Sequence, residues 1–250
     1  MSARLVGAGG GWYIRRGIRR LGGDAPEMTT EPIEKGEPGV GGALRTAAVV
    51  AIACVCGWMT MEMEILGARV LVPKFGGSTY VVMGSVIGVF LLSLAVGYLL
   101  GGWISRLRAS KAALGVCLVL AGLWLCAVPR MVAPLCDALL DAGWDEKWGS
   151  LVAALVLFGV PTALLGTVSP TVVRWLTHRA KDAGLFMGLV LAISTVASFA
   201  GCIVTAFYLV LLSAAHTIIV SGLVLGALGC MILLHAVVAR TAPVPKEDGR

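Results

Sequence analysis

Six long apolar runs constrain this chain more than any other feature of its sequence. They cover about residues 44–66, 80–104, 112–134, 149–173, 184–211 and 213–239. A helix of about twenty apolar residues, rising 1.5 Å per residue, crosses a hydrocarbon core of about 30 Å. The 250 residues are 58% hydrophobic and 14% charged, whereas soluble domains are about one quarter charged. The sequence therefore predicts an all-α, polytopic membrane protein with six transmembrane helices.

Lys and Arg residues fall unevenly on the two sides of these runs. Of the 20 Lys and Arg residues, sixteen lie in the first segment, in the loops near residues 106–111 and 174–181, and in the tail. The other side holds four, namely Arg69, Lys74, Arg130 and Lys147. Because basic residues concentrate in cytoplasmic loops, both termini are predicted to be cytoplasmic. Six helices also allow a 3+3 arrangement of inverted repeats, as in many transporters.

Three parts are predicted along the chain: a basic cytoplasmic segment at residues 1–43, a six-helix transmembrane domain at residues 44–239, and a cytoplasmic tail at residues 240–250. Aromatic and aliphatic residues alternate with arginines over residues 12–20. This pattern fits a short interfacial helix on an anionic leaflet, and a disordered tail that helps to fix topology is the alternative. The first apolar run starts too late for a secretory signal peptide.

Residues that could perform chemistry are sparse. Most of the seven cysteines fall inside apolar runs, where Cys behaves as a small hydrophobe. No Cys/His spacing typical of a zinc site occurs, and His178, His216 and His235 are scattered. The sequence predicts no metal site, no cofactor and no nucleophile–base pair, so we do not expect an enzyme.

A cluster of charges, EMEILGARVLVPKFGG at residues 62–77, ends the first run. Glu62 lies about 26 Å along a straight helix from the start of this run, which places it near the external end of the span. Glu62 and Arg69 are seven residues apart and share a helix face, until Pro73 breaks the helix. Two interpretations stay open: a polar site at the outer mouth formed by Glu62, Glu64 and Arg69, or an internal ion pair that fixes the return of the chain.

Glycines spaced four residues apart let helix backbones approach closely. They predict a compact bundle or a dimer face, and no strand-to-helix context makes them phosphate loops. The predicted packing positions are Gly84, Gly88, Gly97, Gly101, Gly222 and Gly226.

The fourth run contains Pro161 and Pro170, each of which removes a backbone hydrogen bond. Two outcomes stay open, a kinked helix or a broken helix that creates a substrate site near the midplane. Nearby hydroxyls can bond the freed carbonyls, and the fifth run adds a polar line with Ser194 and Ser198 on one face. The hydroxyl residues of the fourth run are Thr162, Thr167, Ser169 and Thr171.

Several stretches together resemble one known family. They are EILGARVLVPKFG at 64–76, SVIGVFLLSLAVGYLLGG at 85–102, the set Pro161, Gly166, Pro170 and Arg174, and LAISTVASFAG at 191–201. In order and spacing they resemble the membrane domain of the bacterial spermidine-synthase-like proteins, also described as fused transporter/spermidine synthases. The resemblance covers about residues 50–240 and matches Glu64 and Arg69. Met83 departs from it, because the family often has Trp there.

The same resemblance implies a soluble aminopropyltransferase-like domain after the last span, whereas ten residues follow Arg240 here. We therefore expect a non-catalytic membrane subunit that anchors or assembles with a partner, either a separate synthase-like enzyme or a larger membrane complex. The alternative is a small-molecule transporter of cationic substrates such as polyamines, acting as a dimer. The expected partners are the lipid bilayer and a protein or second copy, not nucleic acid, and the expected location is the bacterial inner membrane.

Overall fold

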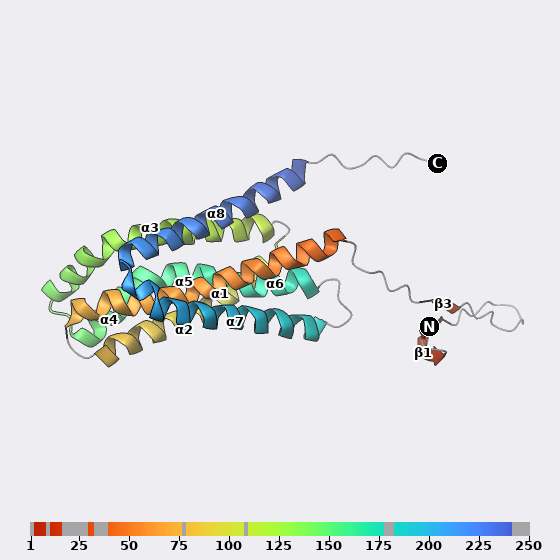
Figure 1. Cartoon of the computed structure of the whole chain (residues 1–250), viewed down its shortest axis with the longest axis horizontal. Coiled ribbons are helices and arrows are strands. Elements are labelled where there is room, and N and C mark those ends of the chain that lie inside the picture. The colour runs from red at the N-terminus through yellow and green to blue at the C-terminus, as the bar shows by residue number, and fades with distance from the viewer. Residues whose placement is uncertain are drawn as a thin grey trace, which may run out of the picture. The chain divides into compact units, whose positions relative to one another are not determined.

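The computed structural model describes residues 3–8, 11–16, 30–32, 40–76, 79–107, 110–177 and 183–241. The chain divides into two compact units, Met1–Arg45 and Thr46–Arg250. Figure 1 shows the elements of both units, coloured from red at the N-terminus to blue at the C-terminus.

The first unit contains a three-stranded antiparallel sheet in the order β1-β2-β3. Its strands are β1 (Ala3–Ala8), β2 (Gly11–Arg16) and β3 (Thr30–Pro32). Val6 pairs with Tyr13, and Ile14 pairs with Glu31. The interfacial helix expected over residues 12–20 is therefore a strand as far as Arg16, and residues 17–20 lie outside the described ranges. Aromatic and β-branched residues favour strands when a neighbouring segment can pair with them.

The second unit is helical, and α1 enters it from the first. Its elements are α1 (Val40–Phe75), α2 (Thr79–Ile104), α3 (Ser110–Asp141), α4 (Glu146–Ala154), the π-helical turn η1 (Leu155–Gly159), α5 (Val160–Gly166), α6 (Val168–Thr177), α7 (Ala183–Phe207), the 3₁₀ turn η2 (Leu209–Leu211) and α8 (Ala214–Thr241).

Six helical stretches of the described chain are long and apolar enough to cross a membrane, which confirms the six predicted spans. They are Thr46–Phe75, Thr79–Ile104, Lys111–Asp141, Glu146–Trp175, Met187–Leu211 and Ala214–Val238. The cytoplasmic location of the termini and the 3+3 arrangement stay predictions.

The first span is longer than its apolar run indicates. Pro73 lies inside α1, and the helix ends at Phe75 before Gly76, whose φ of 62° forms a left-handed end. Proline within a membrane helix kinks the backbone more often than it ends the span. Glu62 is consequently the seventeenth of the 30 residues of its span. It lies close to the middle of this helical stretch, and its predicted depth near the external end stays a prediction.

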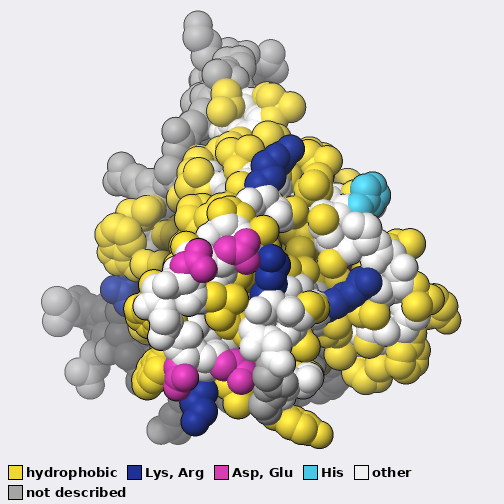
Figure 2. Space-filling view, turned by 90° about the vertical axis from the view of Figure 1, so that its left-hand side faces the viewer, with side chains coloured by type: hydrophobic (Ala, Val, Ile, Leu, Met, Phe, Trp, Pro, Cys, Tyr) yellow, Lys and Arg dark blue, Asp and Glu magenta, His cyan; other side chains and the backbone are white. Residues whose placement is uncertain are grey.

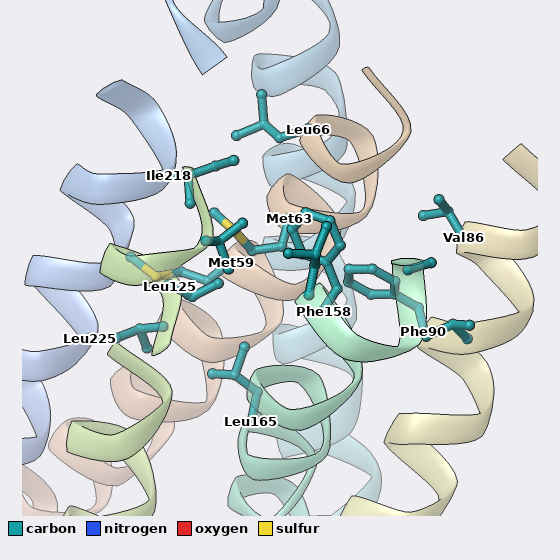
Figure 3. Close-up of a cluster of buried hydrophobic side chains, with 14 of the residues drawn as sticks. Met59, Met63, Leu66, Val86, Phe90, Leu125, Phe158, Leu165, Ile218 and Leu225 are labelled. Atoms are coloured by element: carbon teal, nitrogen blue, oxygen red, sulfur yellow. The ribbon is translucent and has the colours of Figure 1, made fainter. Parts of the chain in front are cut away.

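A cluster of large buried side chains fills the space where the helices meet (Figure 3). Phe90 of α2 and Phe158 of η1 have ring centroids 6.0 Å apart at an interplanar angle of 34°. Met63 and Leu66 of α1 are buried in the same cluster. Since lipid is as apolar as these side chains, the gain comes from close packing rather than from removal of water.

Glycines bring α3 and α8 close together. A Cβ added to Gly122 would lie 2.5 Å from the carbonyl oxygen of Gly222 and 2.6 Å from the backbone nitrogen of Gly226. Farther along, Gly115 and Gly229 face each other in the same way. The predicted packing role of Gly222 is confirmed, whereas a Cβ on Gly226 would meet nothing within 4 Å.

The glycines of α2 face two different ways. Gly97 lies against Ala163 and Gly166, and a Cβ on Gly101 would lie 2.5 Å from the carbonyl oxygen of Thr167. A Cβ on either Gly84 or Gly88 would meet open space, so these two glycines do not pack within the bundle, and a dimer face there stays a prediction.

The helical turn explains this difference. Nine residues separate Gly88 from Gly97, a rotation of about 900°, which brings the second pair to the opposite face of α2. The spacing within each pair indicates a smooth helix face, but it does not indicate whether that face meets the bundle.

Candidate functional site

The fourth span is interrupted at the first of its two prolines. Pro161 follows the π-helical turn η1, and it has no N–H to bond the carbonyl of Leu157 four residues earlier. The indole Nε1 of Trp124, from α3, donates a hydrogen bond of 3.1 Å to that carbonyl. A neighbouring helix therefore satisfies the group that the proline leaves free.

A second interruption separates α5 from α6 at Thr167. The hydroxyl of Thr167 bonds the carbonyl of Leu164 at 2.7 Å, and the hydroxyl of Thr171 bonds the carbonyl of Thr167 at 2.7 Å. Pro170 cannot donate to the carbonyl of Gly166, four residues before it. These two hydroxyls therefore bond the carbonyls of Leu164 and Thr167, not the carbonyl of Gly166 that Pro170 leaves free.

A cavity of about 160 Å³, which we call the hydroxyl cavity, lies beside this second interruption. Four of the six spans contribute to it. Its lining residues are Cys56, Gly57, Thr60 and Met61 of α1, Leu94 and Tyr98 of α2, Leu165 and Gly166 of α5, Ser169 of α6, and Leu191, Ser194, Thr195 and Ser198 of α7.

Most hydroxyls of this cavity are held by backbone carbonyls. Thr60 bonds the carbonyl of Cys56 at 2.8 Å, and Ser194 bonds the carbonyl of Ala53 on α1 at 3.1 Å. The bond of Ser194 therefore joins α7 to α1. Within the described ranges, the hydroxyls of Ser169 and Tyr98 make no protein hydrogen bond. The cavity therefore offers unused polar groups.

The floor and the rims of the hydroxyl cavity come from different helices. Cys56 and Thr60 of α1 are buried, whereas Tyr98 of α2 is 49% exposed and Leu191 of α7 is 45% exposed. The cavity accordingly opens between α2 and α7, on the side where the bundle meets its surroundings.

A second hollow, of about 440 Å³, is lined by α1, α2 and α7 toward the Phe75 end of α1, and we call it the charged groove. Met61 lines both hollows. The charged groove is lined by Met61, Glu64, Ile65, Ala68, Arg69, Val72 and Pro73 of α1, Met83, Val86 and Ile87 of α2, and Cys202 of α7.

The structure separates the three charged residues of the predicted polar site. Glu64 and Arg69 line the charged groove, whereas Glu62 is 4% exposed and lies outside it. Arg69 donates through Nη1 to the carbonyl oxygen of Leu212 at 2.7 Å. In the parts of the chain that the structure describes, no ion pair joins Arg69 to Glu62 or Glu64. The ion-pair interpretation therefore does not hold here.

Glu62 is instead hydrogen-bonded inside the bundle. Its carboxyl accepts from the indole Nε1 of Trp58 at 3.0 Å and from the hydroxyl of Ser221 on α8 at 2.5 Å. The hydroxyl oxygen of Ser221 also lies 3.0 Å from the carbonyl oxygen of Thr217, which is a second acceptor within reach of its single proton. An ionisable group near the middle of a span is costly unless it is paired in this way.

Lys74, the remaining cation of the cluster, pairs with Asp137 at the end of α3 at 3.3 Å. Both side chains are well exposed, so this pair contributes less than about 1 kcal/mol. Figure 2 shows acidic and basic side chains gathered at this end of the helices.

Among the described residues, no three His, Cys, Asp or Glu side chains are grouped so that they could hold a metal ion.

Sequence reasoning missed Thr60, Met61 and Tyr98 as lining residues. Thr60 and Tyr98 are polar positions inside apolar runs, which is the signal that could have found them. Nothing in the sequence marks Met61, because its role depends on where two hollows meet.

No protein-family model, curated protein or solved structure matches this chain.

Proposed function

We propose that this chain is a membrane carrier of small polar molecules and that the hydroxyl cavity is its binding site. The observation that supports this proposal best is the irregular turn at Thr167, beside which the hydroxyl of Ser169 lines the cavity and, within the described ranges, makes no protein hydrogen bond. Interrupted helices that expose backbone groups at membrane depth are a frequent basis of substrate sites in transporters.

The lining of the cavity favours an uncharged or zwitterionic solute over a polyamine. The lining residues supply hydroxyl groups and no carboxyl group. A polyamine would lose its hydration without gaining a carboxylate partner, which is costly at membrane depth. A volume of about 160 Å³ lies below the usual range of about 300–1,000 Å³ for ligand pockets, so the ligand or its bound portion is small.

Uptake into liposomes tests this proposal. The purified chain is reconstituted and offered tritiated leucine, glycerol and spermidine in separate experiments. We expect uptake of leucine or glycerol above that of empty liposomes, and none of spermidine. Absence of uptake of all three solutes by correctly folded protein would refute the carrier function, and uptake of spermidine alone would restore the polyamine alternative.

A second candidate function is that of a membrane subunit that assembles with a partner. The open face of α2 at Gly84 and Gly88 favours it, because a second helix could approach the backbone closely there. This candidate agrees with the resemblance to the membrane domain of spermidine-synthase-like proteins, which we retain as a proposal. Purification in a mild detergent tests it. A stoichiometric partner that is lost on Gly84→Leu supports assembly, and a partner-free monomer argues against it.

A further inference from the structure

The hydroxyl cavity and the charged groove adjoin along α1, and we call the two hollows together the seam. Both are lined by α1, α2 and α7, and Met61 of α1 belongs to both. On α1 the cavity begins at Cys56 and the groove ends at Pro73. These two positions are about 26 Å apart along a helix axis, against a hydrocarbon core of about 30 Å. The seam therefore follows α1 through most of the thickness of a membrane.

The seam is open on the side that faces the surrounding bilayer. Behind it, Cys56 and Thr60 of α1 are buried. In front, Tyr98 at the cavity and Met83 at the groove, both on α2, are 49% and 42% exposed. The α7 flank is more exposed still, because only 11% of the most apolar part of its span is buried, against 33–61% in the other five spans. A molecule in the seam thus meets protein on one side and lipid on the other.

Polar side chains recur at short steps along the seam. On α1 they are Thr60, Glu64 and Arg69, separated by about 6 Å and about 7.5 Å along the helix axis. Ser194 and Ser198 of α7 belong to the same series in the cavity. Ionisable residues within a span are costly and usually mark the path of a polar or charged substrate. The series therefore points to a polar group that moves along the seam.

The two charged members of this series keep capacity for a ligand. In the described part of the chain, the carboxyl of Glu64 makes no protein hydrogen bond or ion pair. Arg69 uses one donor on the carbonyl of Leu212, and a guanidinium has five N–H donors. Leu212 lies in the turn between α7 and α8. Arg69 consequently lies at the level where these helices end, which is where lipid phosphates are found.

We propose that the seam carries phospholipid headgroups between the two leaflets, so that the chain scrambles zwitterionic lipids such as phosphatidylethanolamine. Arg69 binds the phosphate at one end of the route. At the next step Glu64 accepts hydrogen bonds from the ammonium group, and farther along the hydroxyls of the cavity bond the headgroup. Without such partners, a charged headgroup loses its hydration in the hydrocarbon core at great cost.

The lateral opening distinguishes a lipid from a free solute as the occupant of the whole seam. A lipid keeps its acyl chains in the bilayer only if the route of its headgroup is open along one side. This activity goes beyond the proposed uptake of solutes, and it shares only the hydroxyl cavity with that function. Lipid transfer without uptake of leucine or glycerol would refute the carrier alone. Uptake without lipid transfer would refute the lipid route alone.

A fluorescence assay on sealed liposomes measures lipid transfer directly. Liposomes of phosphatidylethanolamine and phosphatidylglycerol, with or without the purified chain, contain a trace of phosphatidylethanolamine that carries a nitrobenzoxadiazole dye on one acyl chain. Dithionite added outside bleaches the dye of the outer leaflet, about half of the total, in empty liposomes. With the chain present, we expect nearly all of the dye to be bleached. A water-soluble dye trapped inside reports any entry of dithionite, and extraction of the lipid by albumin is the second readout.

Matched variants show whether transfer uses the seam. Arg69→Leu and Glu64→Leu should each slow transfer about tenfold, as expected for the loss of one hydrogen bond to a charged group. Arg130→Leu is the control, because Arg130 is an exposed cation outside both hollows that bonds a carbonyl of its own helix. Bleaching of only half of the dye with folded protein overturns the proposal. Equal transfer by the wild type, Arg69→Leu and Glu64→Leu overturns it as well.

The thiol of Cys202 allows the seam to be blocked without replacing a residue, because it lines the groove. Benzylmaleimide attached to Cys202, verified by peptide mass spectrometry, should slow transfer by the wild type. The same treatment should leave transfer by Cys202→Ser unchanged. Transfer that is undiminished in protein labelled at Cys202 would contradict a route through the charged groove.

Discussion

The hydroxyl of Ser221 donates a hydrogen bond of 2.5 Å to the carboxyl of Glu62, and this bond joins α8 to α1 inside the bundle. Trp58 donates a second bond to the same carboxyl from one turn earlier on α1. Glu62 is thus a structural link between helices, whereas Glu64, two residues later, lines the charged groove.

Replacing Glu62 should separate its hydrogen-bonding role from its charge. In Glu62→Ala the indole of Trp58 loses its acceptor, and we expect a loss of about 1–3 kcal/mol of stability. Glu62→Gln keeps an acceptor of similar size and should cost less than Glu62→Ala. Thermal unfolding in detergent, followed by size-exclusion chromatography, measures both. Equal loss in the two variants would show that the charge is what matters.

The glycine contacts of α3 and α8 predict an asymmetric response to alanine. A methyl group at Gly122 meets the backbone of α8, which cannot give way locally, whereas one at Gly226 meets open space. Gly122→Ala should therefore lower the melting temperature clearly and Gly226→Ala should not. The same thermal measurement checks this, and a larger loss in Gly226→Ala would contradict the packing described here.

Thr205 of α7 offers a stabilising substitution. Its hydroxyl is buried and, within the described chain, has no hydrogen-bond partner. Since a buried unpaired polar group costs about 1–3 kcal/mol, the isosteric Thr205→Val should raise the melting temperature. Thr195→Val is the control, because the exposed hydroxyl of Thr195 bonds the carbonyl of Leu191 at 2.8 Å. A drop in stability for Thr205→Val would mean that the hydroxyl has a partner after all.

The excess of Lys and Arg on one side of the spans predicts that both termini lie in the cytoplasm. Fusions of alkaline phosphatase, active outside, and of green fluorescent protein, fluorescent inside, at residue 250 and in the loop near residue 143 test this. We expect fluorescence from the terminal fusion and phosphatase activity from the loop fusion. The reverse pattern would contradict the predicted orientation.

The six spans were predictable because run length alone decides whether a helix can cross a bilayer. The role of Glu62 was not, since its partner Ser221 is 159 residues away and no local pattern connects the two. The end of the first helix was misjudged, because the helix continues past Pro73 to Phe75. The sequence predicted that Pro161 and Pro170 would kink or break the fourth span. It did not predict the cavity, because the cavity depends on how α2 and α7 pack beside α1.

The measurement that tests the central claim most directly is leucine uptake by liposomes containing Ser169→Phe. A phenyl ring in place of a hydroxyl fills the hydroxyl cavity, and Val196→Phe, which changes an exposed residue of α7 outside both hollows, is the control. Each variant is compared at equal amounts of monodisperse protein. The account predicts that uptake is lost in Ser169→Phe and is retained by correctly folded Val196→Phe. Undiminished uptake by Ser169→Phe would contradict the assignment of the cavity as the binding site.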